Sequence, residues 1–138
     1  MKLIFSKLLS YFYLSLAWLK KAITSLLTGR LSAILTIVAV VINLLVWLVA
    51  YVLFHLIGDD LAVLHYNVVF GIDFVGNASQ VFITPLIGLV TLLVNAFLGA
   101  LLLKGQDKIL SLMLLSLAII VNLFCLISLY FLYLINFS

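Results

Sequence analysis

Three long stretches without a charged side chain dominate the pattern of apolar and polar positions along the chain. Within them we expect membrane-spanning helices over residues 32–56, 81–103 and 109–135. Each exceeds the roughly 18 apolar residues that mark a spanning helix. Residues 104–108, which read Lys-Gly-Gln-Asp-Lys, are too few for anything but a tight turn between the second and third helices. The pattern predicts an all-α integral membrane protein built as one membrane domain.

The N-terminal residues 2–28 are apolar on one side only. Such a helix is typical of segments that lie in the membrane interface, with lysines close to anionic head groups. A fourth span would bury Lys7, and a cleaved signal peptide would need a small-residue cleavage site that is missing, so both alternatives are disfavoured. On a helical wheel the polar arc contains Lys2, Ser6, Lys7, Ser10, Tyr13, Lys20, Lys21, Thr24, Ser25 and Thr28, and the opposite side contains Ile4, Leu8, Phe12, Leu19, Ile23 and Leu26.

Composition excludes several classes of protein. The chain has 138 residues, of which 68% are hydrophobic and 8% charged, whereas soluble domains are about one quarter charged. Three spans leave no length for a separate catalytic domain. The basic residues flank apolar stretches and do not cluster on an exposed face, which argues against a nucleic-acid partner. We expect no cofactor, and the single Cys125 should pack between helices because it has no disulfide partner.

The distribution of charge predicts the orientation. All seven Lys and Arg residues precede the first span or lie in the 104–108 turn. The loop 57–80, between the first two spans, contains Asp59, Asp60 and Asp73 but no basic residue. Because Lys and Arg collect on the cytoplasmic side, the N-terminus is expected inside and the C-terminus outside.

The outer loop contains a stretch of strict alternation. From residue 64 to residue 74, even positions are apolar and odd positions are mostly polar or small. This period of two predicts an extended, strand-like segment with His65, Asn67 and Asp73 on one face. Since unpaired backbone is costly in hydrocarbon, the segment should lie at the outer interface or against the helices.

His65 and Asp73 are weak candidates for a metal site or an acid–base pair, with His55, Asp59 and Asp60 nearby in the sequence. Their spacing matches no metal-binding or catalytic motif. We therefore expect no catalytic residue and no metal, and interpret the polar side chains as ties that hold a re-entering loop in place.

One asparagine lies near the middle of each span: Asn43, Asn95 and Asn122. They are expected to form a polar layer that packs the helices, because amides hydrogen-bond across helices and small residues allow close approach. The alternative is an oligomeric channel or carrier lined by these amides, since three helices cannot enclose a pore. Small or polar residues share the same helix faces: Gly88, Thr91, Asn95 and Gly99 on the second helix, and Ser111, Ala118, Asn122 and Cys125 on the third.

Residues 64–76 read LHYN-x-x-FGID-x-x-G. With the later Pro85-Leu86-Ile87-Gly88, Asn95 and Ile135-Asn136, this string resembles a family of small, uncharacterised multi-span membrane proteins of candidate-phylum bacteria. The chain departs from that pattern at residues 77–79, where Asn-Ala-Ser replaces aromatic residues. The resemblance implies a bacterial inner membrane but no activity. It singles out the loop residues His65, Tyr66, Asn67, Gly71, Asp73 and Gly76.

These observations favour a non-enzymatic accessory, assembly or self-associating subunit that docks through its helix bundle and outer loop. Its expected partners are a bilayer with anionic head groups and either another protein or further copies of itself. A channel or carrier is the alternative, and a membrane enzyme or metal binder at His65 and Asp73 is less favoured.

Overall fold

The computed structural model describes residues 2–58, 61–67 and 69–137, without the side chains of residues 2–9, 15, 16, 18 and 19. Asp59 and Asp60 therefore lie outside the described residues, as do the side chains of Lys2 and Lys7. The elements in chain order are α1 (Lys2–Thr28), α2 (Arg30–Ile57), β1 (Leu61–Asn67), β2 (Gly71–Asn77), the 3-10 helix η1 (Ala78–Phe82), α3 (Ile83–Lys104) and α4 (Lys108–Phe137).

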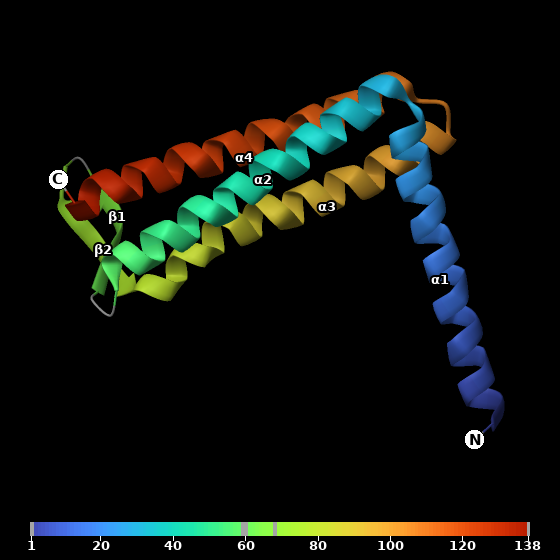
Figure 1. Ribbon diagram of the computed structural model, residues 1–138, viewed down its shortest axis with the longest axis horizontal. Helices are drawn as coiled ribbons and strands as arrows, with labels where there is room; N and C mark the ends of the chain where they lie inside the picture. The colour runs from blue at the N-terminus through green and yellow to red at the C-terminus, as the bar shows by residue number, and fades with distance from the viewer. Residues whose placement is uncertain (1, 59–60, 68, 138) are drawn as a thin grey trace.

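Helices α2, α3 and α4 run side by side as an elongated bundle (Figure 1). The three predicted spans are confirmed as helical segments long and apolar enough to cross a membrane: Arg30–Ile57, Ala78–Lys104 and Lys108–Phe137. Only 28% of the most apolar stretch of each is buried inside the protein. The outward surface of the bundle is therefore largely apolar, which suits lipid and not water.

Glycines end two of the helices. Gly58 has a φ of 68° and donates its N–H to the carbonyl of Phe54, and this positive φ is one that glycine adopts without steric penalty. Gly105 donates its N–H to the carbonyl of Leu101, and the next two residues complete the turn into α4. Pro85 lies in the first turn of α3, where its missing N–H has no intrahelical acceptor.

Helix α1 does not join the bundle as a fourth parallel helix. It leaves the end of the bundle and runs across the direction of α2, α3 and α4 (Figure 1). Its last turns pack on the bundle, where Leu26 is buried with Ala100 and Leu115. At the corner, the Ser32 hydroxyl donates to the carbonyl of Leu26 over 2.7 Å. Leu26, on the predicted apolar arc, thus faces the bundle.

The outer loop is extended as predicted, but the single continuous strand over residues 64–74 is wrong. The segment folds back into an antiparallel hairpin of β1 and β2. A turn separates the strands, where the Val69 N–H donates to the Asn67 side chain over 2.8 Å and Gly71 has a φ of 77°. A lone strand would leave its N–H and C=O groups unpaired, and the hairpin pairs them.

Candidate functional site

The hairpin crosses the end of the bundle that is opposite α1, beside the C-terminus of α4 (Figure 1). Strand β1 packs against α4 and η1, whereas β2 packs extensively only against β1 within the described residues. Ala62 of β1 is fully buried, and Leu64 packs against the core formed by the ends of α2 and α4. The hairpin is therefore part of the packed structure and not a free loop.

Asn136, near the end of α4, fastens β1 to the bundle. Its side-chain Oδ1 accepts the N–H of Val63 and its Nδ2 donates to the carbonyl of the same residue, each over 2.9 Å. The carboxamide therefore pairs with β1 as a peptide group of a third strand would. Asn136 belongs to the residues that carry the family resemblance, but this role depends on a contact 73 residues away in sequence and has no local signal.

His65 and Asp73 come together across the hairpin. The strand register is irregular here, because His65 pairs with Phe74 and the register shifts on both sides of His65, and Nδ1 of His65 lies 2.6 Å from Oδ1 of Asp73. They share a face, as expected, although through pairing of two strands and not through alternation along one. Their side chains are 64% and 38% exposed, so solvent screens any ion pair between them.

This pair has too few neighbours for a metal site. Among the described residues no group of three or more His, Cys, Asp or Glu side chains could hold a metal ion. His55 packs instead edge-on against the ring of Tyr51, with the ring centroids 4.4 Å apart. The arrangement offers one imidazole and one carboxylate at an exposed surface. Their hydrogen bond links the two strands and is accessible to water.

The other residues of the loop motif build the hairpin itself. Asn67 and Gly71 make the turn. Gly76 allows close packing, because a Cβ there would lie 2.7 Å from Cδ1 of Leu64. Tyr66 is an exception. Its side chain is about half exposed, and it lies opposite Ile72 within the strands, so it does not help to form the turn.

A second polar cluster lies inside the bundle. Asn43 of α2 donates to the side-chain oxygen of Asn122 of α4 over 2.8 Å. Asn122 donates in turn to the carbonyls of Ala118 and Gly88 over 2.8 and 3.3 Å, linking α4 to α3. Gly88 fits closely against this pair, since a Cβ would lie 2.5 Å from the Asn122 oxygen. These contacts cross-link all three helices at one level.

Asn95 does not join that cluster. It is 7% exposed and donates to the carbonyl of Thr91 in its own helix over 2.8 Å. Closer to the α3–α4 turn, Gly99 of α3 faces the buried Ser111 of α4, whose hydroxyl has no partner among the described atoms. The expected layer of three asparagines is thus an interhelical pair and a separate third amide. Cys125 is buried in the bundle core.

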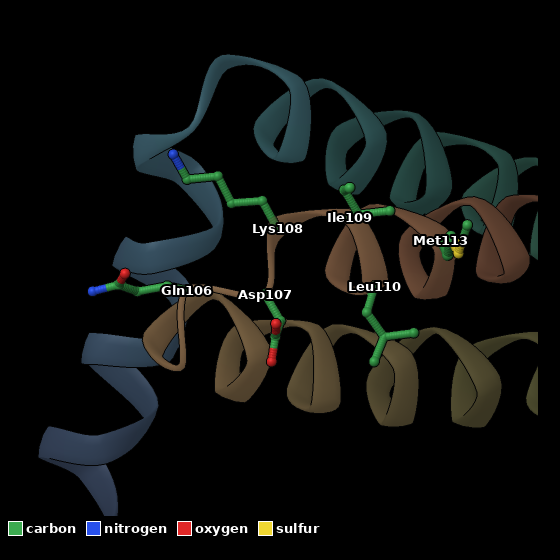
Figure 2. A pocket seen from close by; sticks show the side chains of 6 residues that line it. All are labelled: Gln106, Asp107, Lys108, Ile109, Leu110 and Met113. Atoms are coloured by element: carbon green, nitrogen blue, oxygen red, sulfur yellow. The ribbon is translucent and has the colours of Figure 1, made fainter.

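An open hollow lies at the α3–α4 turn, lined by Gln106, Asp107, Lys108, Ile109, Leu110 and Met113. Figure 2 shows the side chains of Asp107 and Lys108 pointing away from each other, with Ile109, Leu110 and Met113 along α4. One carboxylate and one ammonium that do not converge, beside apolar side chains, give no constellation for binding or catalysis.

Comparison with protein-family models, with curated proteins and with solved structures gives no match for this chain.

Proposed function

We propose that the chain is a non-enzymatic integral membrane protein of the bacterial inner membrane, with its N-terminus in the cytoplasm and its C-terminus outside. The orientation rests on the location of all basic residues at the α1 end of the bundle. In this arrangement α1 lies along the cytoplasmic interface and its lysines meet anionic head groups. The transverse direction of α1 (Figure 1), and the packing of Leu26 against the bundle, support that placement.

Within the membrane, the protein serves as an accessory or assembly subunit that docks through its outer hairpin. The observation that carries this proposal is the difference between the two edges of the hairpin. The edge of β1 is covered, because Val63 pairs with Asn136. Val75 lies opposite Val63, so its N–H and C=O point to the outer edge of β2, which no other described element covers extensively. An open strand edge is a template for a strand from a partner protein or a second copy.

The interior of the bundle does not supply the docking surface. The small residues Gly88, Gly99 and Ala118, which would allow close contact between copies, are buried within one chain. The same packing removes support for a conduit, because Asn43 and Asn122 bond to each other in the core. Docking within the membrane would use the lipid-facing sides of the helices.

Chemical crosslinking in native membranes, followed by native gels, tests the docking edge. Val75→Pro removes the outward N–H of β2 and leaves the hydrogen bonds between β1 and β2 in place. The expected result is loss of the larger species formed by the natural chain, while the control Val75→Thr, which keeps the N–H, retains it. A chain that migrates as a monomer and crosslinks to nothing in its native membrane contradicts the proposal.

A further inference from the structure

The hairpin has two chemically different faces. Side chains alternate between the faces of a strand, and opposite residues of an antiparallel pair lie on the same face. One face contains the exposed, hydrogen-bonded side chains of His65 and Asp73. The other, apolar face contains two directly opposite pairs, Ala62 with Gly76 and Tyr66 with Ile72, and by alternation from these pairs also Leu64 and Phe74, which lie where the strand register shifts.

The bundle covers the apolar face only at the end of the hairpin where β1 begins. Ala62 is fully buried there, and Leu64 is partly buried against the core. Tyr66 lies three residues beyond the Val63–Asn136 contact, which is about 10 Å along an extended strand. At this distal end Tyr66 is 48%, Ile72 56% and Phe74 51% exposed. The turn adds Val69 and Phe70, which are 80% and 81% exposed.

The surface beside the distal end of the hairpin is also apolar and rich in aromatic side chains. On the last turns of α4, Tyr130, Phe131 and Tyr133 are all exposed. Tyr and Phe rings at the end of a span are typical of the membrane–water interface. The hairpin lies beside the C-terminal end of α4 (Figure 1), which is the end of a helix long and apolar enough to cross a membrane.

We propose that the distal half of the hairpin is a lipid-binding anchor in the outer leaflet. Tyr66, Ile72 and Phe74 lie in the boundary between head groups and acyl chains, with Phe70 at the turn. The face that contains His65 and Asp73 points to water. Pairing between β1 and β2 satisfies their inward backbone groups, and at the depth of the head groups the outward groups of the strand edges stay within reach of water. The protein is then held at both interfaces, by α1 inside and by the hairpin outside.

This inference is independent of the partner that docks at the edge of β2. Docking uses outward backbone groups of β2, whereas lipid binding uses side chains on one face of the same strand. A hairpin that lies on lipid would also keep the β2 edge parallel to the membrane surface, accessible to a partner in the same membrane.

Depth-dependent fluorescence quenching tests the anchor. The buried Cys125 is replaced by Ser, and single cysteines are placed at Phe74, Phe70 and Val75 of the full chain. Each variant is labelled with bimane and reconstituted into vesicles of phosphatidylcholine and phosphatidylglycerol. Val75 is the matched control: it neighbours Phe74 in β2, is 46% exposed and lies on the opposite face. All three positions are exposed, and circular dichroism checks that each variant stays folded.

The expected result is several-fold stronger quenching by nitroxide-labelled lipid at Phe74→Cys and Phe70→Cys than at Val75→Cys. A helix bound in the interface buries its apolar face about 5–10 Å deep, and the hairpin labels should report a similar depth. Aqueous iodide should show the reverse order. Equal iodide access at Phe74→Cys and Val75→Cys overturns the proposal. Protection from both quenchers that disappears when the protein is diluted in lipid also overturns it, because a second copy is then the occupant.

Discussion

The carboxamide of Asn136 and the backbone of Val63 are joined by two hydrogen bonds of 2.9 Å each. This contact ties the end of the last helix to the first strand of the hairpin, between elements far apart in the sequence. It closes one edge of a two-stranded sheet that would be marginal alone. The orientation of both hairpin faces therefore depends on this side chain together with the packing of Ala62 and Leu64 against the bundle.

Asn136→Leu removes both bonds and leaves the N–H and C=O of Val63 without these partners. Two hydrogen bonds contribute about 1–3 kcal/mol together, so the free energy of unfolding should fall by about that amount. The hairpin should also become more sensitive to protease. Unfolding by SDS in mixed micelles measures the first effect. Asn136→Asp is the second variant: it keeps an acceptor for the Val63 N–H but sets a carboxylate oxygen against the Val63 carbonyl at the C-terminus of α4, so it should lose at least as much stability, and an Asp variant as stable as the natural chain contradicts the pairing.

Gly88→Ala should destabilise the bundle. The added Cβ would lie 2.5 Å from the side-chain oxygen of Asn122 and 3.0 Å from the nitrogen of Asn43, so the amide pair must shift. Overpacking of this kind costs about 1–3 kcal/mol. Gly99→Ala is the milder control, because its nearest neighbour is the Ser111 hydroxyl at 3.2 Å.

A double-mutant cycle separates this clash from a general effect of alanine in α3. Asn122→Ala alone loses interhelical hydrogen bonds, each worth about 1 kcal/mol in membranes. The pair Gly88→Ala with Asn122→Ala should lose clearly less stability than the sum of the single changes, because the clash partner is gone. Additive losses in SDS unfolding would rule out the contact.

The lengths of the helices were predictable because a bilayer fixes how many apolar residues a span needs. The turn of the hairpin was not. Alternation of apolar residues continues through Val69 and Phe70, so a period of two extends one strand across the turn. Asn67 and Gly71, which flank it, are the only local turn signals, and both residue types also occur within strands.

The polar contacts between helices were likewise predictable only in part. That Asn43 and Asn122 lie at similar depth follows from their central positions in the first and third spans, which run in the same direction. The separation of Asn95, which bonds to Thr91 in its own helix, depends on which face of α3 meets α4, and this requires the packed structure. Asn136 gave no signal beyond the family resemblance, because nothing local identifies Val63 as its partner.

Removing the ion pair should change stability little. His65 and Asp73 are 64% and 38% exposed, and exposed pairs contribute about 0–1 kcal/mol. Asp73→Asn and His65→Ala should therefore each shift the free energy of unfolding by less than about 1 kcal/mol, and the shift should shrink at high salt. Metal analysis of the purified protein provides the second readout. Stoichiometric zinc that is lost in both variants would contradict the structural interpretation and revive the metal hypothesis.

Thiol labelling in intact cells tests the proposed orientation. In the Cys125→Ser chain, Thr28→Cys at the end of α1 and Ser79→Cys in η1 replace exposed hydroxyl residues at opposite ends of the bundle. With all basic residues at the α1 end, a membrane-impermeant maleimide should label Ser79→Cys in intact cells and Thr28→Cys only after the membrane is opened. The reverse pattern contradicts the orientation. Labelling of both positions in intact cells would contradict α2 as a span, because α2 is the element that separates residues 28 and 79.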